Sequence, residues 1–163
     1  MTRLKPISRE AIPHALEKVE RYRLLNEPAE AESICRDVLR AEPDNQRALV
    51  MLLLTLTDQF GRGVGVNETR ALLERIEGEY ERAYYGGIIC ERQGKAQLRT
   101  GTPGADSNAH HWIREAMAAY ERAESLRPPG NDDAILRWNA CARLLRDREL
   151  APRPEDLLEH PIE

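Results

Sequence analysis

The sequence predicts an all-α fold, and three observations lead to that prediction. Aromatic residues make up only 5% of the chain and Phe occurs once, whereas strands favour aromatic and β-branched side chains. Ala, Leu, Glu and Arg, which favour helices, are abundant instead. Apolar residues recur at three-four spacing between breaks rich in Pro, Gly and Asn. With 163 residues, we expect one helical domain over 13–146, an extension over 1–12 and a tail over 147–163.

The first third of the chain contains three predicted helices. They cover residues 13–26, 28–41 and 46–58. Pro28 suits a first helical position, so it marks the start of the second helix. Asp44 or Asn45 can cap the third helix. That third helix is apolar on almost every face, and such a helix is normally buried all round, so we expect it to lie centrally.

Three alternating glycines occur in the segment DQFGRGVGVNETR, residues 58–70. A Walker-type phosphate loop needs a Lys and a hydroxyl after its glycines, and a dinucleotide-binding loop needs a preceding strand. Here no Lys follows the glycines, and the preceding run is predicted to be helical. We therefore interpret this segment as an enlarged turn between helices, with Asn67 capping the next helix.

The remaining helices are separated by a polar loop and a Pro-Gly break. A short helix ends near Gly78, and longer helices are predicted over 79–99, 109–127 and 133–146, with a polar loop over 100–108. Gly86 and Gly87 would each cost a helix about 1 kcal/mol relative to Ala. We therefore expect the backbone of another helix to pass close to them. Asn131 or Asp132 can cap the last helix.

Two segments of the chain align as an internal repeat. The pattern A-x-x-x-C-x-x-V from Ala31 matches A-x-x-x-Y-x-x-A from Ala116, and each is followed at the same interval by a proline, Pro43 or Pro128. This pattern resembles the tetratricopeptide repeat (TPR), in which two antiparallel helices form a 34-residue unit. The resemblance implies antiparallel helix pairs stacked as a short right-handed solenoid of about seven helices. A helical bundle without repeats is the alternative.

The resemblance also implies a concave groove, lined by the first helix of each pair, that binds a peptide or a helix of a partner protein. Carried over residue by residue, the expected partner-binding groove consists of Leu16, Glu20, Arg23, Arg47, Val50, Leu54, Tyr84, Ile88, Glu91 and Arg143. Family members that grip chaperone C-termini use Lys and Asn as a carboxylate clamp. This set contains neither residue type, so the resemblance does not imply that specificity.

Residues that suggest catalysis or metal binding are few. His110 and His111 would point about 100° apart on a helix, so they do not easily face one ion. Cys35, Cys90 and Cys141 are scattered, which is typical of free thiols in a reducing compartment and favours the cytoplasm. We expect no metal site, no cofactor and no enzymatic activity.

Charge and hydropathy also disfavour two partner classes. The formal net charge of −4 is unsuited to a phosphate backbone, so we expect no nucleic-acid binding. The apolar run at 48–57 is too short to span a bilayer as a helix, and the N-terminus has no signal-like apolar core. We therefore expect no membrane association.

The leading hypothesis is a non-catalytic adaptor that binds a partner protein in the apolar groove. The second hypothesis is a homodimer that buries the same groove. The third is a small-ligand binder or enzyme with a pocket joining Tyr84, Tyr85, Cys90 and the His110-His111 pair. The chain's own LLEH segment, residues 157–160, could also cover the groove.

Overall fold

Seven α-helices make up the part of the chain that the computed structural model describes, residues 1–157, and that part contains no β-strand. The helices are α1 (Ile12–Leu24), α2 (Pro28–Ala41), α3 (Gln46–Thr57), α4 (Val66–Arg75), α5 (Glu79–Thr100), α6 (Ala105–Leu126) and α7 (Asp133–Asp147). Two short 3-10 turns lie at Arg9–Ala11 and Pro154–Leu157. The predicted all-α class is confirmed.

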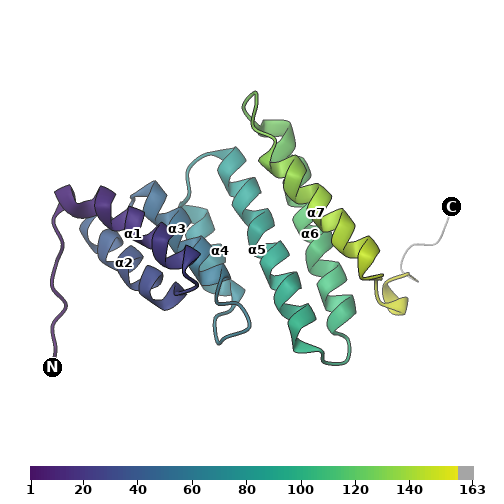
Figure 1. Cartoon of the computed structure of the whole chain (residues 1–163). Coiled ribbons are helices and arrows are strands. Elements are labelled where there is room, and N and C mark those ends of the chain that lie inside the picture. The colour runs from purple at the N-terminus through teal and green to yellow at the C-terminus, as the bar shows by residue number, and fades with distance from the viewer. Residues whose placement is uncertain (158–163) are drawn as a thin grey trace. The chain divides into compact units, whose positions relative to one another are not determined.

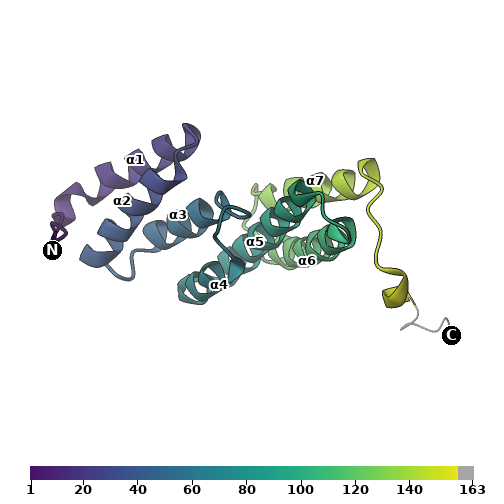
Figure 2. The same ribbon diagram turned by 90° about the horizontal axis from the view of Figure 1, so that it is seen from below.

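The chain divides into two compact units, Met1–Glu77 (unit 1) and Gly78–Glu163 (unit 2). In unit 1, α1 packs on α2, α2 on α3 and α3 on α4 (Figures 1 and 2). In unit 2, α5 packs along α6, and α6 packs on α7. Within each unit, helices adjacent in sequence are therefore neighbours in space. The region 13–146, predicted as one helical domain, extends over both units.

Helix α3 forms the centre of unit 1, as its apolar sequence predicts. It contacts α1, α2 and α4. Its residues Leu49, Leu52, Leu53 and Leu56 are at most 2% exposed. Full burial of a leucine side chain contributes roughly 1.5–3 kcal/mol, so these four residues are a main source of the stability of unit 1.

The turns of unit 1 follow from local sequence. Asn26 adopts a left-handed conformation (φ 58°), and the N–H of Glu27 donates to the carbonyl of Tyr22 at 2.8 Å. This pattern ends α1, and Pro28 then begins α2. At the start of α3, the Asn45 side chain accepts a hydrogen bond from the Ala48 N–H at 2.9 Å, which confirms the predicted cap.

The glycine segment is a turn anchored by one aromatic side chain. Gly61 and Gly63 have φ values of 84° and 90°, a conformation that favours glycine. Phe60, the only Phe in the chain, is 1% exposed and fixes the segment to the core. Helix α4 begins at Val66 with Gly65 at its N-cap position and no side-chain cap. The predicted cap at Asn67 is therefore wrong, because Asn67 already lies inside the helix.

Glycines in α5 allow close contact with α6. An added Cβ at Gly87 would lie 2.5 Å from the Tyr120 ring, and one at Gly94 would lie 2.9 Å from Ile113. The expected close approach exists at Gly87, but its partner is an aromatic ring and not a helix backbone. Helix α6 also starts earlier than predicted, at Ala105, directly after Gly104 in a left-handed conformation. The polar loop predicted over 100–108 is correspondingly shorter.

Candidate functional site

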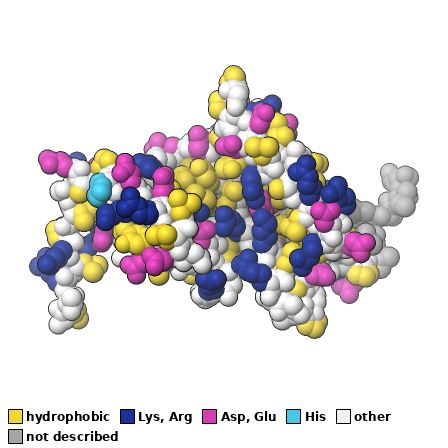
Figure 3. Space-filling view, in the orientation of Figure 1, with side chains coloured by type: hydrophobic (Ala, Val, Ile, Leu, Met, Phe, Trp, Pro, Cys, Tyr) yellow, Lys and Arg dark blue, Asp and Glu magenta, His cyan; other side chains and the backbone are white. Residues whose placement is uncertain are grey.

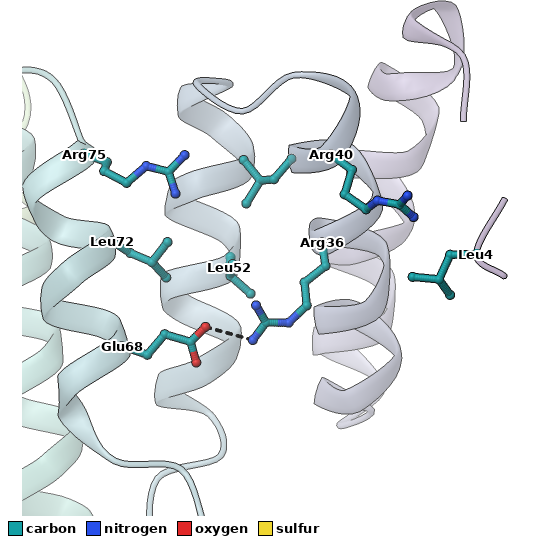
Figure 4. Close-up of a pocket in the computed structure, with 8 residues that line it drawn as sticks. Leu4, Arg36, Arg40, Leu52, Glu68, Leu72 and Arg75 are labelled. Atoms are coloured by element: carbon teal, nitrogen blue, oxygen red, sulfur yellow. Dashed lines mark hydrogen bonds and ion pairs between the residues drawn. The ribbon is translucent and has the colours of Figure 1, made fainter. Parts of the chain in front are cut away.

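A cavity of about 450 Å³ lies between α2 and α4 in unit 1, with α3 beneath it (Figure 4). We call it the α2–α4 cavity. Its lining residues are Leu4, Arg36, Leu39, Arg40, Leu52, Glu68, Leu72 and Arg75. Its volume falls within the range typical of ligand-binding clefts, about 300–1,000 Å³.

The floor and the inner walls of the cavity are made of leucines. Leu39 comes from α2, Leu52 from α3 and Leu72 from α4. Leu52 and Leu72 are 2% and 6% exposed, so their side chains form a fixed apolar surface. Leu4, in the segment before the first helix, contributes a fourth leucine at the edge and is 66% exposed. An apolar group of a ligand would therefore find a preformed apolar floor.

The rim of the cavity is basic and asymmetric. At one end Arg36 of α2 reaches across to Glu68 of α4, and the two side chains form an ion pair at 3.0 Å (Figure 4). At the other end lie Arg40 and Arg75. The guanidinium of Arg75 donates to the carbonyl of Pro43 at 2.5 Å, which leaves its charge unneutralised by a carboxylate. Glu68 is the only acidic lining residue, and it is already paired.

Several polar contacts hold the two walls in place. The Arg36–Glu68 pair joins α2 to α4 at one end of the cavity. Near the other end, the Gln46 side chain donates to the carbonyl of Arg75 at 3.2 Å and accepts from the N–H of Glu77 at 2.8 Å. These contacts fix the C-terminal end of α4 against the start of α3. The cavity is thus a formed feature of unit 1 and needs no rearrangement to open.

The three charged groove residues predicted in unit 1 form bridges from α1 to α3 and its C-terminal end. Glu20 accepts from Arg47 at 3.1 Å, and Arg23 donates to Asp58 at 2.7 Å. Leu16 is 3% exposed and packs in the core with Ile12, Val38 and Ala48, so its expected place on a groove surface is wrong. It belongs to the stripe that α1 buries. Val50 and Leu54 are half-buried on α3, and their role in binding stays a prediction.

The groove residues predicted in unit 2 differ strongly in exposure. Arg143 is exposed, and Tyr84 is half-buried beside Tyr80, Tyr85 and Tyr120. Burial raises the pKa of the Tyr84 hydroxyl to about 12. Ile88 is 7% exposed.

Glu91, also predicted to line the groove, is 1% exposed and is surrounded by donors from α5, α6 and α7. It accepts hydrogen bonds from Lys95 at 2.7 Å and from the Tyr120 hydroxyl at 3.0 Å. Arg137 of α7 donates to both of its oxygens, and the Cys141 thiol lies 3.5 Å away. We call these five residues the Glu91 cluster. The expected placement of Glu91 on a groove rim is wrong, because the side chain holds three helices together.

The electrostatics of the Glu91 cluster follow from two opposed effects. Burial raises the pKa of the Glu91 carboxyl, but hydrogen bonds and charges from Arg137 and Lys95 outweigh burial, and the pKa lies below its ordinary value. The carboxylate is therefore ionised at neutral pH. Figure 3 shows Lys and Arg side chains gathered over α5 and α7 on the face that it displays. Lys95 and Arg137 belong to these helices and are 40% and 34% exposed.

The residues considered for chemistry do not form one site. Cys35 and Cys141 are buried, and burial raises the pKa of each thiol to about 12, which makes both poor nucleophiles. His111 lines a separate hollow of about 230 Å³ with Trp112 and Arg153, and neither Tyr84 nor Cys90 lines it. Within residues 1–157, no group of three His, Cys, Asp or Glu side chains is placed to hold a metal ion.

Sequence reasoning missed the α2–α4 cavity. A signal was present: Leu39 of α2 lies one turn from Arg36, and Leu72 of α4 lies one turn from both Glu68 and Arg75, so each helix combines a leucine with charged residues at that spacing. The part of the LLEH segment beyond residue 157 lies outside the described residues, as does His160.

No helix in the described part of the chain combines the length and the apolar character needed to cross a membrane.

Comparisons with protein-family models, with curated proteins and with solved structures found no match. The TPR-like arrangement is therefore an interpretation of this chain's own residues and helix order.

Proposed function

We propose that this chain is a non-catalytic protein-interaction module that binds a peptide segment of a partner protein in the α2–α4 cavity. The observation that carries the proposal is a preformed cavity of about 450 Å³ with a leucine floor and polar rim. An extended segment or a helix could place one or two apolar side chains on such a floor while charged groups fix its register.

The composition of the cavity favours binding over catalysis. Its lining residues are leucines, arginines and one glutamate, and that glutamate is paired with Arg36. Arginine can stabilise a developing charge, but the lining offers no nucleophile and no unpaired acid or base for proton transfer. An apolar floor with a charged rim is the arrangement expected of a docking site.

The order of the helices supports a TPR-like arrangement as part of this proposal. In both units each helix packs on the next one along the chain, as in stacked helix pairs. Repeat proteins of this kind commonly bind other polypeptides. In such an arrangement α2 and α4 would be the second helices of successive pairs, so the cavity would differ from the groove expected from the sequence.

A displayed library of random peptides, panned against the full chain, tests this function. Enriched peptides should lose about tenfold or more in affinity for Leu39→Asp, because a carboxylate on the apolar wall is costly to desolvate. Leu4→Asp, which alters the exposed edge and leaves the core intact, should reduce the affinity of these peptides less. Circular dichroism confirms that each variant folds.

Leu136→Asp provides the matched control, since Leu136 is 62% exposed in unit 2 and does not line the cavity. Peptides should bind this variant as they bind the parent chain. Equal binding to folded Leu39→Asp would move the site elsewhere, and a library with no enriched peptide would refute the function.

A further inference from the structure

The α2–α4 cavity carries an uneven distribution of charge that points to one class of ligand. Three arginines and one glutamate line it, and the glutamate is neutralised by Arg36. Arg36 also pairs with Glu32 at 3.0 Å, so its positive charge is shared between two carboxylates. The charge that remains available to a ligand therefore belongs to Arg75 of α4 and Arg40 of α2, which lie on opposite walls, with the Arg40 guanidinium turned outward toward Leu4 (Figure 4).

We propose that the partner segment is an acidic peptide that places a leucine-like side chain on Leu39, Leu52 and Leu72 and its carboxylates next to Arg75 on one wall and Arg40 on the other. This inference rests on the proposed function and names the chemistry of its ligand. Charge complementarity is the ground for assigning the ligand to an acidic segment of another protein, and a second copy or a small amphiphile is an outcome of the test given below.

The two arginines provide this complementarity. Arg40 makes no ion pair with a described residue, and Arg75 is held by a backbone carbonyl that leaves its charge unneutralised. A carboxylate that approaches either guanidinium group would form charge-assisted hydrogen bonds, the stronger class of such bonds. Lysine or arginine in a ligand would meet this end of the cavity with the same sign of charge. The rim therefore selects against basic segments.

The ion pair at the opposite end sets the orientation of the ligand. Arg36 and Glu68 span the cavity from α2 to α4 and satisfy each other (Figure 4). A charged ligand group placed there would have to displace an existing pair, whereas one placed beside Arg40 and Arg75 would not. The apolar side chain would therefore lie between the two ends, over Leu52 and Leu72.

The N-terminal segment adds a third element of recognition. Leu4 lies beside Arg40 at the edge of the cavity and is largely exposed. Lys5 follows it and faces the same stretch of α2, near Asp37 and Arg40. Leu4 extends the apolar floor, and Lys5 lines a neighbouring hollow together with Asp37 and Arg40. An acidic peptide that is longer than one anchor residue would continue in this direction along α2.

Chemical-shift titration of the ¹⁵N-labelled full chain tests the inference. The probes are the synthetic peptides Glu-Glu-Leu-Leu-Glu-Glu, its uncharged counterpart Gln-Gln-Leu-Leu-Gln-Gln and its anchor-free counterpart Glu-Glu-Ala-Ala-Glu-Glu. We expect saturable shifts at amides of α2 and α4 with the first peptide, and about tenfold weaker binding of the other two. Added salt should weaken the binding of the first peptide and leave the binding of the uncharged peptide unchanged.

Matched variants separate specific recognition from net charge. Arg40→Gln combined with Arg75→Gln should reduce the affinity for the acidic peptide to that for the uncharged one. Arg21→Gln combined with Arg62→Gln removes the same charge from exposed positions of unit 1 that do not line the cavity, and should retain binding. Both pairs leave the buried core unchanged, so their folding can be verified by circular dichroism.

The remaining outcomes decide against the inference in distinguishable ways. Equal binding of the acidic and uncharged leucine peptides would overturn the acidic ligand while leaving peptide binding in place. Shifts with sodium laurate but with none of the peptides would assign the cavity to a small amphiphile and would refute both proposals. Shifts in α2 and α4 that vary with protein concentration alone, and that Arg40→Gln with Arg75→Gln removes, would assign it to a second copy.

Discussion

The two units of this chain use charged residues in opposite ways. In unit 1 the arginines of the α2–α4 cavity stand at the rim of an apolar floor, and only some of them are paired. In unit 2 the Glu91 carboxylate is buried, and donors from three helices satisfy it. A charge surrounded by its own partners stabilises the fold, whereas an unneutralised charge beside an apolar floor remains available to a ligand.

The same contrast applies to how the helices pack. In unit 2 the glycines of α5 bring it into direct contact with the Tyr120 ring and Ile113 of α6, so the two helices pack closely at these positions. In unit 1, α2 and α4 are held apart by α3, and the space between them is the cavity. The close α5–α6 contact and the α2–α4 cavity thus occur in different units, so each can be altered separately.

The largest effect is expected from Glu91→Ala. Removal of this carboxylate leaves Arg137, Lys95 and the buried Tyr120 hydroxyl without their shared acceptor. Loss of one partner from a buried ion pair typically costs 3–5 kcal/mol. We expect the free energy of unfolding to fall by about 3 kcal/mol. This is the low end of that range because Lys95 and Arg137 keep contact with water. Denaturant unfolding measures it.

Two controls sharpen this prediction. Glu115→Ala removes an exposed glutamate from α6 and should change stability by less than about 0.5 kcal/mol. The pKa of Glu91 lies below its ordinary value of 4.5, so its stabilising effect is present above that pH and is lost as the pH falls through the lowered pKa. The difference in the free energy of unfolding between the parent chain and Glu91→Gln should therefore become smaller in acid. A difference that does not change with pH would contradict the assignment.

A smaller loss is expected from Gly87→Ala. The new methyl group would lie 2.5 Å from the Tyr120 ring, which is fully buried and bonded to Glu91. Overpacking of this kind costs about 1–3 kcal/mol, and the higher helix propensity of Ala returns about 1 kcal/mol. Thermal unfolding should show a net loss of about 1 kcal/mol. Gly65→Ala, with no atom within 4 Å of the added Cβ, should be nearly neutral.

Sequence reasoning succeeded at several local signals, although the Asn67 cap was wrong, and it failed where the signals are distant. The start of α2 at Pro28 and the cap of α3 depend on residues within one turn; the first was predicted correctly, and Asn45 is one of the two cap residues that the sequence offered. Glu91 and Arg137 are 46 residues apart, so no local pattern shows that the carboxylate is buried and paired. The sequence places Glu91 on an apolar helix face, where a charged residue suggests a groove rim.

The α2–α4 cavity was missed for the same physical reason. Its ends are defined by contacts between Arg36 and Glu68, which are 32 residues apart, and by the height at which α4 packs on α3. Leu39 and Leu72 each read as ordinary core residues of an amphipathic helix. Their common role depends on the space that α3 leaves between two helices, and that spacing is a tertiary property.

The smallest effect is expected from Glu68→Gln, which breaks the ion pair with Arg36 at the end of the cavity opposite Arg40 and Arg75. Both side chains are about half exposed, at 45% and 50%, and such pairs contribute at most about 1 kcal/mol because water screens them. Arg36 also retains Glu32. Denaturant unfolding should show a loss below 1 kcal/mol that disappears at high salt. A loss comparable to that of Glu91→Ala would mean that this pair is a structural support of unit 1, and the distinction drawn between the two units would fail at this point.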